Sequence, residues 1–365
     1  QVIITSYDLL KRDRAAYLGR TFEYEIIDEA QVIKNAKTQG AKAVKEISAN
    51  ARFALTGTPV ENRLSELWSI FDFLMPGFLY SYRKFRERYE LPIVKNQDPE
   101  ALTALRRMTG PFVLRRLKKD VLRELPTKEE RIVYSAASGR QQKLYTASAL
   151  KLKEALAGGA WSGNGKLEVL SQLMRLRQIC CDPALCFEDY TGESAKLETC
   201  VSLIASASAA GHKILLFSQF ASMLERIRER LLQEGISSHL LVGATPKEER
   251  SRMVQAFASD EVPVFLISLK AGGTGLNLTA ADIVIHYDPW WNVAAQNQAT
   301  DRAYRIGQEK PVTVYKLILK DTIEENLLKL QNAKLALAAQ VVSEGMVSLG
   351  DLSQNELMEL FEQNP

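Results

Sequence analysis

The sequence has few of the residues that hold metals or build disulfide frameworks. Its cysteines, Cys180, Cys181, Cys186 and Cys200, form no Cys-x-x-Cys pair, and its three histidines lie far apart. A zinc site is therefore not expected, and reduced packing thiols in a cytoplasmic protein are favoured. No apolar run approaches the roughly 20 residues of a membrane span, and no signal peptide opens the chain, so no membrane partner is expected.

An excess of one charge is also missing. The chain has 47 Lys and Arg against 44 Asp and Glu, a net charge of +3. This balance does not require a nucleic-acid partner but allows one where basic groups cluster. The basic stretch YRKFRERYE (82–90) is either a solvated face or the lining of a polyanion site. With 365 residues, two or more domains of about 100–200 residues are expected.

The first 59 residues alternate between short apolar runs and a helical pattern. We predict buried strands at VIITSY (2–7), YEIID (24–28) and RFALTG (52–57), and a helix at TQGAKAVKEIS (38–48). This alternation is typical of βαβ units with a parallel sheet. Because Gln1 is not an initiator methionine and VIITSY reads as the middle of a strand, we expect the chain to be part of something longer.

Helical patterns dominate the middle of the chain. We predict a helical insertion at about 60–108, and helices over 139–180 that a glycine-rich loop interrupts at 158–166. From about Ser194 the strand and helix alternation becomes regular, which predicts a second α/β unit. Its expected strands are KILLFSQF (213–220), SHLLVG (238–243), VPVFLIS (262–268), DIVIHYD (282–288) and VTVYKLIL (312–319). Its tail from Ile323 is expected to be a long helix with a polar end.

Polar motifs follow several of these strands, where ligands bind in open parallel sheets. Asp28 and Glu29 follow YEII, so one carboxylate could hold magnesium while the other polarises a water. An ordinary polar turn is the alternative. TGTP (56–59) follows RFAL. SLKAGGTGLNL (268–278) lacks the G-x-G-x-x-G spacing, although its glycines would let the backbone approach a phosphate or ribose.

The segment QNQATDRAYRIGQ (296–308) holds a second candidate site. Gln298, Arg302 and Arg305 are spaced four and then three residues apart, which on a helix would place them on one face. Two guanidinium groups and an amide would suit an anion with several oxygens, such as a phosphate. A surface helix with scattered arginines is the alternative.

Five segments follow one another along the chain in this order: IIDEAQ, LTGTPVEN, ILLFSQF, SLKAGGTGLNLTAADIVIHYDPWWN and QATDRAYRIGQ. The set closely resembles motifs II to VI of the Swi/Snf-type ATPases of helicase superfamily 2. PFVLRRLKKDVLRELPTKEE (111–130) is also similar to a stretch of that family, and the resemblance covers nearly the whole chain. Glutamine at Gln31, where the family often has histidine, resembles its bacterial branch.

The resemblance implies an α/β fold of two RecA-like parallel-sheet lobes, the first one truncated, with helical insertions and a C-terminal helical brace. The implied boundaries are 1–135 for the first lobe with its insertion and 136–193 for a helical linker. The second lobe would span 194–335 and the tail 336–365.

The resemblance also implies roles for the first lobe. Asp28 would hold the magnesium of magnesium-ATP, and Glu29 would orient and deprotonate the attacking water. Thr56 and Thr58 would couple the nucleotide state to lobe movement.

In the second lobe, Gly275 and Asn277 would lie near the nucleotide. Arg302 and Arg305 would be arginine fingers on the γ-phosphate, with Gln298 beside them.

The resemblance also implies a group of residues that contact DNA. Ser218, Gln219 and Ser268 would approach the DNA backbone. Trp290 and Trp291 resemble the family's tryptophan pair near the DNA-facing cleft, although aromatic residues after a strand are often core.

The departures from the family pattern concern coupling and the nucleotide. Tyr304 replaces a common histidine and Val293 a common proline, which we expect to tune coupling. The phosphate loop G-x-x-x-x-G-K-[ST] does not occur in these 365 residues; the pair Gly165-Lys166 is followed by Leu167. We therefore expect this loop upstream and the chain alone to be inactive.

The implied function is ATP-dependent translocation along double-stranded DNA, with Mg²⁺-ATP hydrolysed between the lobes and protein–DNA complexes remodelled. The implied partners are duplex DNA and a DNA-bound protein target, in the cytoplasm or, in a bacterium, on the nucleoid. Two alternatives stay open: a superfamily 2 helicase that separates strands or acts on RNA, and a catalytically silent DNA-binding module.

Overall fold

The computed structural model describes residues 1–57, 64–114, 116, 118–122, 124–137, 139–157, 165–272, 276–329 and 331. These residues form two compact units, whose described parts fall within Gln1–Arg116 and Leu117–Gln331. Across the described ranges, no helix combines the length and apolarity that crossing a bilayer would need.

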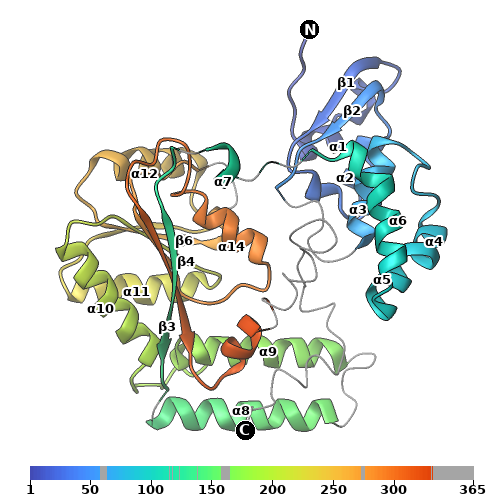
Figure 1. The fold of residues 1–365 in the computed structure, drawn as a ribbon. Helices are drawn as coiled ribbons and strands as arrows, with labels where there is room; N and C mark the ends of the chain where they lie inside the picture. The colour runs from blue at the N-terminus through green and yellow to red at the C-terminus, as the bar shows by residue number, and fades with distance from the viewer. Residues whose placement is uncertain are drawn as a thin grey trace. The chain divides into compact units, whose positions relative to one another are not determined.

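The first unit is built on two parallel strands, β1 (Thr21–Ile27) and β2 (Ser48–Ala54), drawn in blue in Figure 1. Helix α2 (Gln39–Lys45) connects them, as predicted. The strand predicted at 2–7 is wrong, because residues 1–6 have no regular structure and α1 (Tyr7–Arg12) begins there. The Ser6 hydroxyl accepts a hydrogen bond from the Leu9 amide at 3.3 Å, so this serine caps a helix instead of continuing a strand.

The rest of the first unit is helical, as the sequence predicts. Leu64, Leu67 and Phe71, which are spaced for one helical face, are buried at 5% exposure or less. They pack with Phe85 and Leu105 into a core of their own. The elements are α3 (Leu64–Leu74), α4 (Tyr82–Phe85), the π-helical turn η3 (Arg86–Glu90), α5 (Leu91–Asn96) and α6 (Pro99–Thr109).

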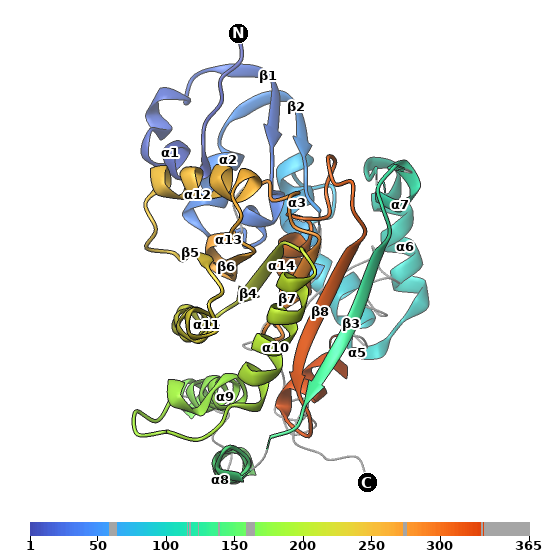
Figure 2. The same cartoon turned by 90° about the vertical axis from the view of Figure 1, so that its left-hand side faces the viewer.

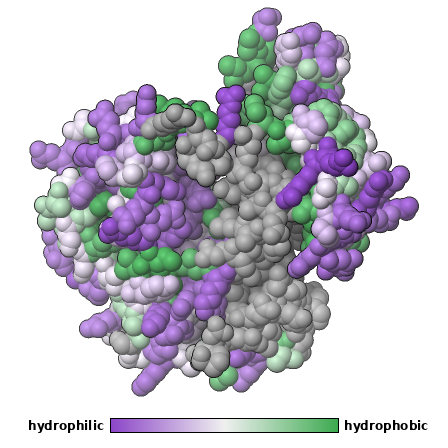
Figure 3. All heavy atoms as spheres, in the orientation of Figure 1, coloured by the Kyte–Doolittle hydropathy of each residue, from purple (hydrophilic) through white to green (hydrophobic). Residues whose placement is uncertain are grey.

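The two faces of the β1–β2 pair differ. Ile27 packs into the core with residues of α2 and α3. On the other face Tyr24, Ile26 and Phe53 are 61%, 62% and 48% exposed, and Figure 3 shows apolar (green) surface in this part of the unit. Within the described residues, the pair is therefore packed on one face only.

The second unit contains a six-stranded sheet in the order β3-β8-β7-β4-β6-β5, in which every pair is parallel. All five strands predicted after Ser194 are present. The strands are β3 (Lys128–Ser135), β4 (Ile214–Ser218), β5 (Ser238–Leu241), β6 (Val264–Ser268), β7 (Ile283–His286) and β8 (Val312–Leu319).

Both faces of this sheet are covered. Leu216 packs with α10 (Ala195–Ala209) and α11 (Ala221–Gln233), whereas its neighbour Leu215 packs with α12 (Lys247–Ser259) and α14 (Val293–Thr300). Successive strand residues point to opposite faces, so a continuous apolar run is what a sheet buried on both sides requires. The two units thus have the parallel α/β architecture that the sequence predicts.

The strand at 128–135 pairs with β8 along its whole length, and Figure 2 shows the two side by side. The division between the units therefore falls near Leu117, whereas the sequence suggested 135. Because Lys128 pairs with Val312, the pairing joins segments too distant for local sequence pattern to report.

Two long helices, α8 (Gly139–Ala157) and α9 (Gly165–Cys181), lead into the sheet, as predicted. The glycine-rich loop between them lies outside the described residues at 158–164. Residues 323–329 are helical, and the predicted tail beyond 331 lies outside the described residues as well. The cysteines are free, and three of the four are buried.

Candidate functional site

In the first unit, the turn after β1 carries the paired carboxylates. Asp28 and Glu29 are both exposed, and Glu29 has a left-handed backbone conformation with φ of 51°. Asp28 Oδ1 accepts a hydrogen bond from the Glu29 amide at 2.8 Å. A non-glycine residue in this region costs about 1–3 kcal/mol, and such strain concentrates at functional sites.

Backbone hydrogen bonds hold this turn against the turn after β2. The Leu55 amide donates to the Ile27 carbonyl at 2.8 Å, and the Ala30 amide donates to the Leu55 carbonyl at 2.9 Å. These bonds continue the β1–β2 pairing past Ala54. They bring the turn that begins at Thr56 beside the carboxylates.

Gln31 joins the two turns through its side chain. Its Nε2 donates to Glu29 Oε2 at 2.5 Å, and its Oε1 accepts from Thr56 Oγ1 at 2.7 Å. From the sequence, Gln31 is only a variation on the family pattern. Its place two residues after Glu29 was the available signal, but the link to Thr56 required the paired strands. Thr58, the second predicted coupling residue, lies outside the described residues.

Tyr7 supports the same turn. Its hydroxyl donates to the Asp28 carbonyl at 2.6 Å. Burial, followed by the negative charges of Asp28 and Glu29, raises the pKa of Tyr7 to about 12. The phenol therefore remains a donor at neutral pH. Sequence reasoning missed this residue because 21 positions separate it from Asp28.

The chemistry of the turn fits a magnesium-nucleotide. Mg²⁺ is commonly held by one or two carboxylates together with substrate phosphates and water. Asp28 would hold the ion, since its carboxylate is exposed and, among the described residues, the turn engages only its Oδ1. A bound Mg²⁺ would neutralise charge on the transferring phosphate.

In the second unit, the prediction that Gln298, Arg302 and Arg305 share one face of a helix is wrong. Helix α14 begins after Asn292, whose Oδ1 accepts from the Ala295 amide at 2.7 Å, and the helix ends at Thr300. Gln298 is on the helix, whereas Arg302 and Arg305 lie in the turns that follow. The three side chains therefore do not project from one helical face, because the helix stops before the arginines.

The turns that carry the arginines are held by the segment before β7. The Leu278 amide donates to the Arg302 carbonyl at 3.0 Å, which brings the exposed Asn277 near the arginine turn. Gln308 Nε2 donates to the carbonyls of Thr279, Ala281 and Ala303 at 3.0, 2.8 and 3.1 Å. Asn277 is thus brought near Arg302. Gly275 lies outside the described residues.

The two arginines differ in accessibility. Arg302 is 8% exposed, whereas Arg305 is exposed. The turn between α14 and Arg302 is also held by Lys118 on α7 (Lys118–Val121), which pairs with Asp301 at 2.7 Å and donates to the Tyr304 carbonyl at 3.2 Å. Lys118, which precedes β3 in the chain, therefore stabilises the arginine turn, a contact that the sequence pattern did not indicate.

The expected DNA-contacting serines are buried. Asp288 Oδ1 accepts hydrogen bonds from Ser218 Oγ at 2.5 Å and from the Gln219 amide at 3.2 Å. Ser268 Oγ accepts from the Ala271 amide at 3.3 Å and caps α13 (Leu269–Gly272). Both hydroxyls are engaged by partners within the lobe. Contact between these residues and DNA remains a prediction, and the half-buried Gln219 is the most accessible of the three.

The tryptophans occupy two environments although they are adjacent. Trp290 packs against the core cluster under α12 and α14, and its carbonyl accepts from Gln331 Nε2. Trp291 is half-buried, with the Arg177 guanidinium 5.4 Å from its ring centre. The core interpretation therefore holds for Trp290.

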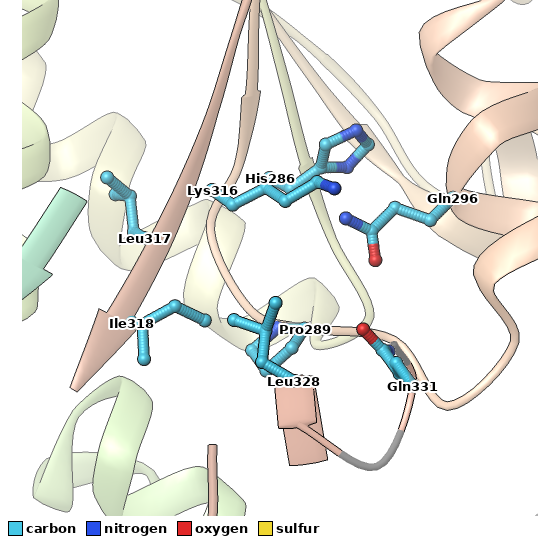
Figure 4. A pocket seen from close by; sticks show the side chains of 8 residues that line it. All are labelled: His286, Pro289, Gln296, Lys316, Leu317, Ile318, Leu328 and Gln331. Carbon is cyan, nitrogen blue, oxygen red and sulfur yellow. The ribbon is translucent and has the colours of Figure 1, made fainter. Parts of the chain in front are cut away.

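A small pocket lies beside the turn after β7. Figure 4 shows the polar side chains of His286, Lys316 and Gln296 on one side and the apolar side chains of Leu317 and Ile318 on another. It has essentially no room for even a water molecule, so it is far smaller than an ordinary ligand pocket. We assign no nucleotide to it.

Comparisons with known proteins agree with this geometry. Residues 1–185 match the SNF2-related domain, and residues 195–307 match the helicase conserved C-terminal domain. The putative ATP-dependent helicase/translocase YwqA of Bacillus subtilis is 42% identical over 99% of this chain and 40% of its own length. Human TATA-binding protein-associated factor 172 is 35% identical over 99% of this chain and 23% of its own length.

Among solved structures, the Sulfolobus solfataricus SWI2/SNF2 ATPase core in complex with dsDNA matches with a TM-score of 0.56 and 36% identity. The match covers 98% of this chain and 76% of that chain. The chain spans less than half the length of both curated relatives described above. With both domains matched in order and the polar motifs at the strand ends, the chain belongs to the SWI2/SNF2 family of ATP-hydrolysing helicase-type enzymes, and its two units are RecA-like lobes.

Proposed function

We propose that this chain is the motor core of an ATP-driven translocase that moves on double-stranded DNA and remodels protein–DNA complexes. The observation that carries the proposal is the chain of hydrogen bonds from Glu29 through Gln31 to Thr56. A carboxylate that activates water is thereby joined to the adjacent turn by one side chain. A change at the carboxylate would be transmitted to that turn.

The exposed carboxylates have distinct roles in this proposal. Asp28 holds the magnesium ion that accompanies ATP. Glu29 orients the attacking water and accepts its proton, a role for which an exposed carboxylate on a strained turn is suited.

The second lobe supplies positive charge to the same reaction. Arg305 is the exposed finger that stabilises the charge developing on the γ-phosphate. Arg302 is largely buried and supports the turn as well as the phosphate. Gln298 and Asn277 lie on the segments that flank this turn and complete the nucleotide contacts.

DNA contact is assigned to the turns after β4, β6 and β7. Gln219 would contact the phosphate backbone, with Ser218 shaping the turn after β4 and Ser268 the turn after β6. Contacts of this kind are independent of sequence and weaken as salt rises. The similarity to a family core solved with dsDNA supports a duplex as the track. The similarity to a TATA-binding protein-associated factor supports a DNA-bound protein as the target.

The test uses the full-length protein with duplexes of increasing length. A translocase hydrolyses ATP at a rate that rises with duplex length and then levels off, because it reaches a DNA end less often. A labelled strand should remain paired throughout. Efficient displacement of a long strand, or stimulation by RNA without stimulation by duplex DNA, would favour the strand-separating alternative.

The remaining alternative is a catalytically silent DNA-binding module. Such a module would bind duplex DNA with the same salt dependence in the presence and absence of ATP. It would release no phosphate in the full-length protein, and Glu29→Gln would change nothing measurable.

A further inference from the structure

A buried arginine outside the family motifs named above connects two of the turns assigned to DNA. Arg177 lies on α9 and is 1% exposed. Its Nη1 donates to Gln219 Oε1 at 2.9 Å, and its Nη2 donates to the Pro289 carbonyl at 2.7 Å. One guanidinium therefore holds the turn after β4 and the turn after β7.

The same guanidinium also contacts an acid and two aromatic rings. Nη2 lies 3.6 Å from Asp288 Oδ2, and Asp288 Oδ1 in turn binds Ser218 and the Gln219 amide. The guanidinium carbon lies 5.4 Å from the Trp291 ring centre and 5.9 Å from that of Phe220. Arg177 is thus the centre of a buried network whose outer members belong to both turns.

The network is costly to bury, which argues for a role beyond packing. Among the described residues, nothing accepts a hydrogen bond from the buried Gln219 Nε2 or Trp291 Nε1. Each such group costs about 1–3 kcal/mol. Burial also raises the pKa of Asp288, although the charge of Arg177 opposes that change.

We propose that Arg177 is a positioning residue that fixes Gln219 and Trp291 relative to each other, so that both meet the DNA backbone in one arrangement. The inference rests on the proposed function. Lysine cannot replace arginine here, because an ammonium lacks the planar fork that reaches two separate acceptors. Arg177 acts through the two turns and touches neither nucleotide nor DNA itself.

The test is Arg177→Lys in the full-length protein. ATP hydrolysis without DNA should stay within about twofold of wild type. The duplex concentration for half-maximal stimulation should rise about tenfold, the scale of 1–2 kcal/mol of lost coupling. Hydrogen exchange should increase in segments 218–220 and 288–292 and not elsewhere in the second lobe.

Arg175→Lys is the matched control. Arg175 lies on the same helix two residues earlier, is exposed and contacts Phe187. It should leave DNA stimulation and exchange unchanged. If Arg177→Lys does not fold, the charge-balanced double variant Arg177→Met with Asp288→Asn replaces it, with the same loss of stimulation expected.

The outcomes separate the two proposals. A wild-type protein that duplex DNA does not stimulate would overturn the proposed function and this inference with it. Normal DNA stimulation in Arg177→Lys would overturn the inference alone. Increased exchange across the whole second lobe would show a general structural role and would also overturn it.

Discussion

The carboxylate turn of the first lobe and the buried network around Arg177 in the second lobe lie in opposite environments. Asp28 and Glu29 in the first lobe are exposed, and their contacts are with neighbouring turns. Asp288, Ser218 and Arg177 in the second lobe are buried at 1% exposure or less. An exposed carboxylate is available to a ligand and contributes little to stability, whereas a buried ionic network sets geometry and is costly to break. The carboxylate turn of the first lobe is therefore open to a ligand, whereas the Arg177 network of the second lobe fixes the geometry of the turns around it.

The largest effect should come from the phosphate loop, which the 365 residues do not contain. We expect this chain alone to bind ATP weakly and to release no phosphate above background, since exposed carboxylates need phosphates held against them. The full-length protein should release phosphate steadily. The measurement is phosphate release by both proteins, with Glu29→Gln as control. Turnover by the chain alone that Glu29→Gln abolishes would mean that the site is complete without the loop.

Arg302 and Arg305 extend the comparison of buried and exposed side chains to two residues close together in the chain. In the full-length protein, Arg305→Ala should lower kcat about 10³-fold or more with little change in ATP binding or melting temperature, because its side chain is exposed and acts in the transition state. Steady-state kinetics, ATP binding and calorimetry measure this.

Arg302→Ala is the matched variant. Since Arg302 is 8% exposed, its loss should lower the melting temperature as well as kcat. An unchanged kcat with a raised KM for Arg305→Ala would instead make it a ground-state ligand.

Asp288 and Asp28 allow the stability contributed by a buried carboxylate to be compared with that of an exposed one. Asp288→Asn should destabilise the second lobe by about 3 kcal/mol, because it leaves the buried Arg177 without its carboxylate. Asp28→Asn should change stability by less than about 0.5 kcal/mol, because that side chain is exposed. Urea unfolding of the two variants measures the difference. Equal losses would show that the exposed turn is as important to the fold as the buried network.

The smallest expected effect is the pH dependence of His286. Its ring is buried, with Nε2 2.9 Å from Thr300 Oγ1. Burial, and then the charge of Lys316, lowers the pKa of His286 from 6.5 to about 3. The folded state therefore keeps the ring neutral, while the unfolded chain takes up a proton below pH 6.5. The stability contributed above pH 6.5 is lost as pH falls towards 3, by about 2 kcal/mol at pH 5.

Urea unfolding at pH 7.5 and pH 5.0 checks this expectation. His286→Asn should reduce the difference between the two pH values. If His286→Asn keeps the wild-type difference, other groups account for it.

The sequence predicted strands correctly where a continuous apolar run indicates burial on both faces of a sheet. The runs ILLFS and VFLIS are apolar without alternation, and both became central strands buried on both faces. It failed at VIITSY, where the same apolar character leads into a helix that Ser6 caps. A short apolar run does not identify its own partner, so its conformation depends on whether a strand lies beside it.

The candidate site divides in the same way. Asp28, Glu29 and Arg305 could be named from the sequence because their motifs are contiguous. The roles of Gln31, Tyr7 and Lys118 could not be predicted, because their partners are distant in sequence. The partner of Gln31 is 25 positions away, that of Tyr7 is 21 and that of Lys118 is 186.

By itself the sequence determined the family, the order of strands and helices after Ser194, and the residue types at each strand end. The tertiary structure decided which side chains of one type are buried. Arg177 and Arg175 lie on one helix, and Arg302 and Arg305 in one turn, yet one member of each pair is buried and the other exposed. The reason is that burial depends on which distant segments pack against a residue. That packing brings β4 beside β7 and α9 beneath the turns that follow them.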